Sequence, residues 1–125
     1  MLRTPAEILI IDDDYVMREL LELHLTDEGY KVRTAEDAVT GGKMLLAAPP
    51  DLLVLDMHMP HMEGDQFLKL LRDDESFKDL KVIVLTAEQS IKFMLKITDI
   101  CVSDFLVKPI DKAMLLATVK KVLAA

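Results

Sequence analysis

The stretch EILIIDDDYV, residues 7–16, decides the fold. A run of four aliphatic residues, 8–11, leads directly into three aspartates, Asp12, Asp13 and Asp14. A short continuous apolar run is typical of a strand buried on both faces, as strands of parallel sheets are. Like charges this close disfavour the ionised form of each carboxyl group, so three acids at the end of a buried strand need a compensating feature nearby.

The rest of the chain repeats this alternation of apolar runs and segments with helical periodicity. We expect strands at residues 8–11, 30–34, 51–56, 81–87 and 104–108, and helices at about 14–28, 35–47, 65–72, 90–100 and 112–123. This alternation predicts an α/β fold: a flavodoxin-like, doubly wound, five-stranded parallel sheet in the order 2-1-3-4-5, with five helices covering both faces. Because neither a repeat nor a linker interrupts the pattern, residues 1–125 are expected to form one domain, without an output domain.

Composition and charge narrow the classes of function. The net charge is −7, with 22 acidic and 15 basic residues, whereas affinity for nucleic acid depends on lysines and arginines that neutralise phosphates. We therefore expect a protein partner or a cation, and no direct contact with nucleic acid. No apolar run approaches the roughly 18 residues that a membrane span requires. The chain opens without a leader-like segment, and its one cysteine, Cys101, has no partner for an internal disulfide, so the sequence predicts a cytoplasmic protein without membrane contact.

Functional groups are expected where the predicted strands end. In an open α/β sheet the ligand lies beyond the carboxyl ends of the strands, at the point where the winding reverses, here between the first and third strands. Asp12 and Asp13 follow the first strand and Asp56 ends the third, so these acids are predicted to converge. Thr86 and Lys108 close the fourth and fifth strands and add a hydroxyl and an ammonium group. Hard oxygen ligands suit Mg²⁺, which binds through one or two carboxylates and a phosphate, and this ion is the compensating feature that the acids need.

A carboxylate beside a metal ion and a lysine is suited to phosphoryl chemistry. Carboxylates act as nucleophiles that form aspartyl phosphates. The metal ion and Lys108 would neutralise charge on the transferring oxygens, and the Thr86 hydroxyl would donate a hydrogen bond to one of them.

Four motifs at the ends of predicted strands resemble those of the receiver domain of two-component response regulators. They are the acid pair Asp12-Asp13, DMHMPHMEG at 56–64, LTA at 85–87 and FLVKP at 105–109. The second is similar to the phosphoacceptor loop D-x-x-M-P-x-M-D-G of that family, with Glu63 in place of the usual aspartate. The resemblance covers nearly the whole chain.

This resemblance implies a phosphorylation-activated signalling switch, not an enzyme beyond its own phosphorylation and dephosphorylation. Asp56 would accept a phosphoryl group from a histidine kinase or a histidine phosphotransferase. The Mg²⁺ ligands would be Asp13, Asp56 and the backbone carbonyl of His58, with Asp12 acting largely through water.

The resemblance also implies how the switch moves. Lys108 would pair with the phosphoryl group, and Thr86 would move to hydrogen-bond it. Phe105 stands where the family has a tyrosine or phenylalanine whose rotamer reports that movement. The Lys108-Pro109 peptide is in this family usually cis, as X-Pro bonds permit.

The helix expected at 90–100 has apolar residues on two nearly opposite sides. They are Ile91, Met94 and Leu95 on one side, and Phe93, Ile97 and Ile100 on the other. Only one side can face the sheet. We hypothesise that the other, with the fifth strand and the last helix, contacts a downstream protein partner, an output domain or a second copy of the chain.

Structural roles are the simpler interpretation of several other residues. Asp14 is predicted to cap the first helix. The methionines of the 56–64 motif, Met57, Met59 and Met62, are predicted to fill the core. His58 and His61 form D-x-H-x-x-H with Asp56, but we expect them to face solvent and not to bind a transition metal.

Two functional alternatives compete with the switch. Residues 12–16 also fit the D-x-D-x-[TV] start of haloacid-dehalogenase-type phosphatases. Those enzymes need a further acid pair after the lysine strand, where only Asp111 is present, and usually a cap domain. The other alternative is a degenerate receiver that acts as a binding module, although every residue type of the acceptor site is present.

Overall fold

The computed structural model describes residues 5–59, 62–87 and 102–125, and in this part of the chain the predicted sheet is confirmed. Its strands are β1 (Glu7–Ile11), β2 (Lys31–Ala35), β3 (Leu52–Asp56), β4 (Lys81–Thr86) and β5 (Asp104–Val107). All neighbouring strands are parallel, in the order β2-β1-β3-β4-β5. The order places β1 beside β3, so the winding reverses between them as predicted.

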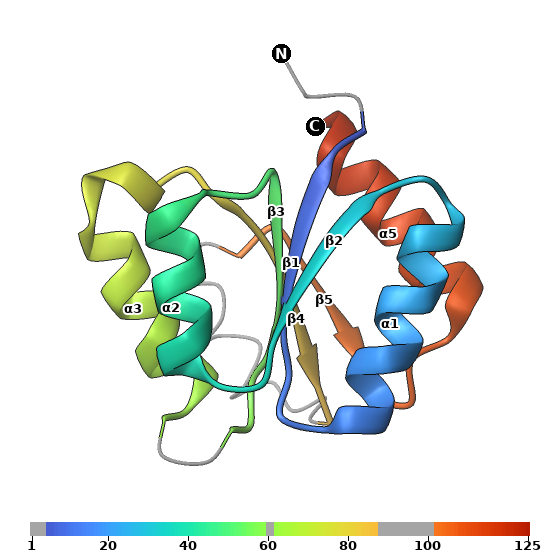
Figure 1. Cartoon of the computed structure of the whole chain (residues 1–125), viewed down its shortest axis with the longest axis horizontal. Helices are drawn as coiled ribbons and strands as arrows, with labels where there is room; N and C mark the ends of the chain where they lie inside the picture. Colours follow the sequence, from blue (N-terminus) through green and yellow to red (C-terminus); the bar gives the residue numbers. More distant parts are fainter. Residues whose placement is uncertain (1–4, 60–61, 88–101) are drawn as a thin grey trace.

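Helices cover both faces of the sheet. They are α1 (Tyr15–Asp27), α2 (Ala38–Ala47), α3 (Gly64–Asp73) and α5 (Lys112–Ala124), with a short 3₁₀ helix, η1 (Glu75–Phe77), after α3. α2 and α3 lie on one side of the sheet, and α1 and α5 lie on the other (Figure 1). Of the five helices expected, four are thus observed, and the one expected at 90–100 lies outside the described residues.

Alternation along the central strands divides the core into two layers. In β1, Leu9 and Ile11 join the cluster beneath α2 and α3, whereas Ile8 and Ile10 join the cluster beneath α1 and α5. All four side chains are fully buried. A continuous aliphatic run therefore forms a strand because both of its faces are covered.

Aspartates cap the helices that follow β1, β2 and β5. The Asp14 carboxylate accepts a hydrogen bond from the backbone N–H of Met17 at 3.1 Å, which confirms its predicted role. The Asp111 carboxylate caps α5 by accepting a hydrogen bond from the backbone N–H of Met114 at 3.1 Å. These capping bonds satisfy backbone donors that have no partner within the helix.

The prediction that α2 begins at residue 35 is wrong by three residues. Ala35 is the last residue of β2, where it pairs with Ile11 of β1. The helix starts at Ala38, after Asp37 has capped it by accepting a hydrogen bond from Thr40 N at 2.7 Å. Pairing with β1 thus extends the strand into a segment whose local pattern favoured a helix.

Membrane insertion has no candidate element in the described part of the chain. None of the helices seen there combines the length and the apolar composition of a membrane span.

Candidate functional site

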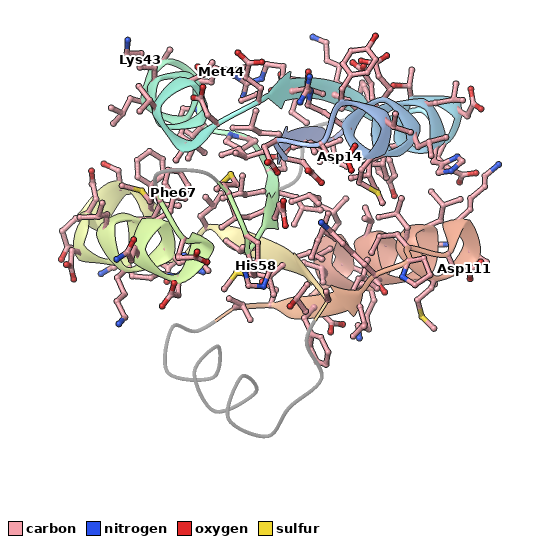
Figure 2. The ribbon with its side chains drawn as sticks, turned by 90° about the horizontal axis from the view of Figure 1, so that it is seen from below. Asp14, Lys43, Met44, His58, Phe67 and Asp111 are labelled. Carbon is pink, nitrogen blue, oxygen red and sulfur yellow. The ribbon has the colours of Figure 1, made fainter. Side chains whose placement is uncertain are left out.

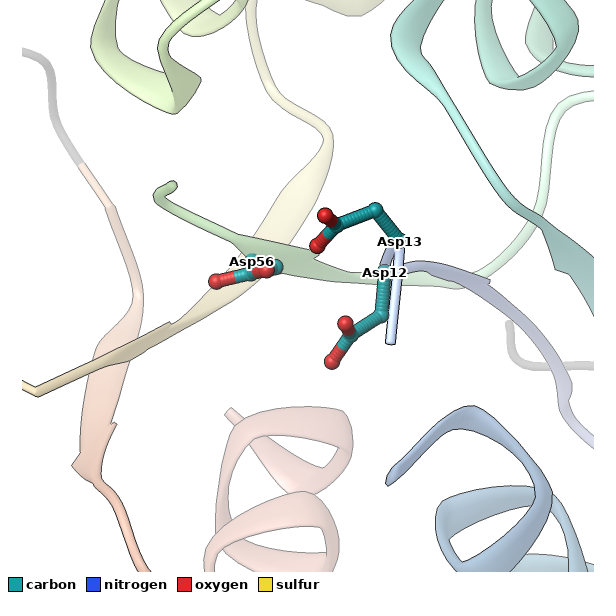
Figure 3. Close-up of side chains that lie close together, drawn as sticks. All are labelled: Asp12, Asp13 and Asp56. Carbon is teal, nitrogen blue, oxygen red and sulfur yellow. The ribbon is translucent and has the colours of Figure 1, made fainter. Parts of the chain in front are cut away.

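Three carboxylates from two strands meet at one edge of the sheet. Asp12 and Asp13 directly follow β1, and Asp56 is the last residue of β3. Because Ile11 pairs with Leu55 in the parallel register, the residues after each come side by side. One carboxylate oxygen from each acid lies within 4.8 Å of the others (Figure 3). The structure therefore brings together the acids that the sequence predicted to converge.

Asp12 is buried, and one of its oxygens lacks a protein partner. Its Oδ1 accepts a hydrogen bond from Asp14 N at 2.9 Å, and Oδ2 has no hydrogen-bond partner among the described residues. The Asp12 side chain is fully buried. A buried polar atom without a partner costs free energy, so this oxygen is suited to bind a ligand that the protein itself does not provide.

The electrostatics of the cluster are unfavourable without a counter-charge. Burial, followed by the charge of Asp56, raises the pKa of Asp12 to about 6 against the opposing effects of a backbone hydrogen bond and Lys108. Burial and the neighbouring Asp56 also raise the pKa of Asp13. Burial and, to a smaller extent, nearby negative charge thus destabilise the ionised form of these two acids, and a divalent cation would offset that penalty.

The donor set of this cluster fits Mg²⁺. All three side chains offer carboxylate oxygens, which Mg²⁺ prefers, and the unpartnered Asp12 Oδ2 is one of them. Asp13 is exposed, which leaves room on the solvent side for the waters that the ion usually retains. The fit therefore follows from donor chemistry and from the unpartnered oxygen.

Asp56 also has a positively charged partner. Its side chain is almost fully buried, and its Oδ1 accepts hydrogen bonds from Lys108 Nζ and from His58 N, both at 3.2 Å. Lys108 follows β5, where its backbone N–H donates to Thr86 O at 2.7 Å and its peptide bond to Pro109 is cis. The predicted nucleophile and the predicted lysine are therefore in direct contact.

Thr86 and Phe105 occupy neighbouring strands close to this contact. Thr86 ends β4 and is fully buried. Phe105 lies in β5, where it pairs with Val84 of β4 and packs, half-buried, against the core cluster beneath α2 and α3. Both residues lie where the resemblance places the switch pair, and their role in switching stays a prediction.

The side chain of His58 is engaged by an acid that the sequence analysis did not associate with it. Its Nδ1 lies 3.3 Å from Oε2 of Glu63, and both side chains are about half exposed. Glu63 also forms a capping box with Gln66 at the start of α3. Gln66 stands three residues after the N-cap, as in a capping box, but Glu63 is not a usual N-cap residue, and its contact with His58 depends on the shape of the loop. His61, the other histidine of the motif, lies outside the described residues.

A second contact that the sequence analysis missed fixes the turn after β1. Arg18 in α1 donates a hydrogen bond from its guanidinium to the backbone carbonyl of Asp12 at 2.8 Å. The Arg18 guanidinium also lies over the Tyr15 ring, 5.6 Å from its centroid. These contacts tie the start of α1 to the residue that carries the unpartnered oxygen.

The prediction that the methionines of the 56–64 motif fill the core is confirmed. Met57 and Met59 are buried in the core cluster beneath α2 and α3, and Met62 packs against that cluster.

Comparison with known protein families agrees with this geometry. The family model described as the response regulator receiver domain matches residues 8–120. The chain belongs to this family. The predicted resemblance is thereby confirmed, together with the assignment to two-component signal transduction.

Curated receiver-containing proteins and solved receiver structures are similar over most of the chain. The DNA-binding dual master transcriptional regulator RpaA of Synechocystis is 36% identical over 93% of this chain and 48% of its own length. The response regulator PleD of Caulobacter vibrioides is 38% identical over 92% of this chain and 25% of its own length. The chain therefore spans about half of one relative and a quarter of the other.

Among solved structures, the chemotaxis protein CheY4 of Vibrio cholerae superposes with a TM-score of 0.89 at 31% identity, over 94% of this chain and 98% of that one. A putative response regulator from Chloroflexus aurantiacus superposes with a TM-score of 0.91 at 32% identity, over 97% and 99% of the two chains. Both likenesses extend over the whole receiver fold.

Proposed function

We propose that this receiver domain is a switch that is activated when Asp56 accepts a phosphoryl group in a Mg²⁺-dependent reaction. The observation that carries the proposal is the position of Asp56, which belongs to the three-acid cluster and whose Oδ1 lies 3.2 Å from Lys108 Nζ. A nucleophile in this position lies next to both a cation and a candidate metal site. Such groups neutralise charge on transferring phosphoryl oxygens.

The donor in this proposal is a phosphohistidine of a histidine kinase or a histidine phosphotransferase. A carboxylate oxygen of Asp56 attacks the phosphorus, the bond between phosphorus and the histidine nitrogen breaks, and an aspartyl phosphate forms. The leaving imidazole takes up a proton from solvent. Because Lys108 Nζ and His58 N both bind Oδ1, they orient the carboxylate for this attack.

Mg²⁺ would be held by Asp12, Asp13, Asp56 and the backbone carbonyl of His58, and it would supply positive charge to the phosphoryl oxygens. The residues of the chain complete the site. Lys108 pairs with the transferred group, and the hydroxyl of Thr86 donates a hydrogen bond to it.

Phosphorylation changes the surface by a two-state movement in this proposal. The new group carries about −1.5 to −2 charges, and a nearly complete shift of a two-state equilibrium needs about 5.5 kcal/mol of differential stabilisation. Bonds from Thr86 and Lys108 to the phosphoryl group contribute to that difference. Phe105 and the surface of β5 and α5 then change, so that an output domain, a separate partner or a second copy of the chain can bind.

Intact-mass analysis after incubation with acetyl phosphate tests the proposal. We expect wild-type protein with Mg²⁺ to gain the mass of one phosphoryl group. Asp56→Asn, which keeps the shape of the side chain but removes the nucleophile, is expected to gain none, and excess chelator is expected to prevent the gain in wild type. Unchanged labelling of Asp56→Asn would contradict the proposal.

The two alternatives give different results in the same assay. A phosphatase would release inorganic phosphate from a phosphomonoester over many turnovers, whether or not the protein itself gained mass. A degenerate receiver would gain no mass under any condition, while it still bound its partner.

A further inference from the structure

A groove between α2 and α3 lies apart from the acceptor site. It encloses about 510 Å³, within the range of about 300–1,000 Å³ that is typical of ligand sites. Its walls are mainly apolar, with Leu46 on the α2 side and Phe67 and Leu71 on the α3 side. Figure 2 shows Phe67 on the side of α3 that is nearest to α2. The groove is therefore a concave apolar surface between two helices.

Three large apolar side chains project into solvent at its rim. Val39 and Leu46 on α2 and Leu70 on α3 are 68%, 70% and 61% exposed, and all three line the groove. Single exposed apolar residues are common, but a cluster around one concavity marks an interaction site. A small molecule within the groove would leave these rim side chains in water, whereas a helix lying along it would cover them.

The dimensions of the groove suit a helix. α2 and α3 each have ten residues, which corresponds to about 15 Å at 1.5 Å per residue. Helices that bind in such grooves insert side chains at positions i, i+4 and i+7, which span roughly 10 Å on the same rise per residue. Two to three turns of a partner helix therefore match the length of the groove.

Both ends of the groove are acidic. Asp37 precedes α2 and Asp74 follows α3, and both line the groove; Glu36 and Asp73 are their neighbours in sequence. Because both helices connect parallel strands of one sheet they run in the same direction, so these acid pairs lie at opposite ends. Hydrogen bonds from Thr40, and to a smaller extent the charge of Lys43 in the groove lining, keep the pKa of Asp37 low. The ends therefore attract basic residues.

Gly42 keeps the groove open. It lines the groove from the middle of α2, where glycine costs about 1 kcal/mol relative to alanine. A Cβ at this position would lie 3.8 Å from Phe67 Cε1, an ordinary contact. Alanine therefore fits here without disturbance, whereas a longer side chain would extend into the groove.

We propose that the α2–α3 groove binds an amphipathic helix of a partner protein, with three large apolar side chains at i, i+4 and i+7 and a lysine or arginine at each end. The apolar side chains fill the groove and cover its rim, and the basic ends pair with the two acid pairs. This binding goes beyond the phosphorylation switch and does not require it, so Asp56→Asn protein is expected to bind equally well.

The test is selection from a displayed library of short helix-forming peptides against the full chain, followed by measurement of Kd for the selected peptide. We expect a consensus with apolar residues at i, i+4 and i+7 and basic residues at both ends. Gly42→Leu, which fills the groove, and Leu46→Glu, at its rim, are each expected to weaken binding by about tenfold or more, or about 1.4 kcal/mol.

Two matched variants control for folding and for nonspecific apolar contact. Gly42→Ala makes the same change toward a stronger helix former without filling the groove, and it is expected to leave Kd unchanged. Leu23→Glu alters a residue that is 54% exposed on α1, across the sheet from the groove, and it is also expected to leave Kd unchanged. Circular dichroism and thermal melts confirm that each variant is folded.

Other outcomes would overturn the proposal. These are a selection that yields no consensus, a consensus without basic ends, or a peptide whose Kd is unaffected by Gly42→Leu. If a small apolar dye binds in a manner that Gly42→Leu abolishes while no peptide is selected, the groove is a small-molecule site and the helix proposal is wrong.

Discussion

Lys108 Nζ lies 3.2 Å from Asp56 Oδ1, although 52 positions separate the two residues in the sequence. Parallel pairing of β3, β4 and β5 brings their carboxyl ends to one edge of the sheet. The Asp56 side chain is almost fully buried, and 27% of the Lys108 side chain is exposed. The ammonium group is thus the protein cation that faces the predicted nucleophile.

Removal of this cation is expected to affect both stability and phosphoryl transfer. Lys108→Ala leaves the buried Asp56 carboxylate without its charged donor, which we expect to lower the free energy of unfolding by about 1–3 kcal/mol. Phosphorylation by acetyl phosphate is expected to slow as well. Urea unfolding and a labelling time course measure the two effects. Lys120→Ala, an exposed change on α5, is the control and should stay within about 0.5 kcal/mol; an equal effect of both variants would contradict this role of Lys108.

Neutralisation of an acid in the cluster is expected to separate stability from metal binding. Asp13→Asn removes one of three crowded negative charges, so the metal-free protein is expected to become more stable at neutral pH. Mg²⁺ at 100 times its Kd stabilises wild type by about 2.7 kcal/mol, and this gain is expected to be lost. Thermal melts with Mg²⁺ and with chelator measure both changes.

A neighbouring residue provides the matched control for Asp13→Asn. Asp14 caps α1, and asparagine caps helices about as well as aspartate. Asp14→Asn should therefore keep the Mg²⁺-dependent rise in melting temperature. If it lost that rise as Asp13→Asn does, the metal would respond to overall charge and not to the three-acid site.

Acidification is expected to stabilise the metal-free protein. Asp12 has a pKa of about 6 in the folded state against an ordinary value of 3.8, so between these values the folded state binds more protons than the unfolded chain. Stability in chelator therefore falls as the pH rises from about 4 to 6. Urea unfolding across this range measures the slope. Asp12→Asn is the reference variant, and a slope identical to that of wild type would exclude Asp12 as the cause.

The loop after Asp56 is expected to tolerate no side chain at Gly64. A Cβ there would lie 2.7 Å from Met57 Cα and 3.1 Å from Asp56 O, so the backbone next to the nucleophile would have to shift. We expect Gly64→Ala to destabilise the protein by about 1–3 kcal/mol, as overpacking does, and to slow labelling of Asp56. The control is Gly42→Ala in α2, the neighbouring helix on the same face of the sheet, and it is expected to stabilise the protein by up to about 1 kcal/mol. Equal stability of the two variants would contradict the close approach.

The convergence of the acids was predictable because it follows from the positions of the strand ends and the expected strand order. Once Asp56 is known to end a strand next to the one that precedes Asp12, parallel pairing places them together without detailed packing. Helix caps at Asp14 and Asp111 were predictable for a similar reason, since a cap depends on residues within one turn.

Contacts that depend on side-chain direction or strand extension were not predictable in this way. The predicted start of α2 was wrong because Ala35 pairs with Ile11, a contact between segments distant in sequence. The hydrogen bond from Arg18 to Asp12 O and the contact of His58 with Glu63 depend on rotamers and loop shape. The α2–α3 groove likewise exists only once the two helices are placed side by side.

The central claim, that Asp56 is phosphorylated beside a magnesium ion held by the three acids, is tested most directly by locating the phosphoryl group. Protein treated with acetyl phosphate is reduced with borohydride, which converts an aspartyl phosphate to homoserine, and is then mapped by peptide mass spectrometry. We predict homoserine at position 56 alone, present with Mg²⁺ and absent with chelator. Homoserine at another aspartate, or at position 56 to the same extent in chelator, would contradict the claim.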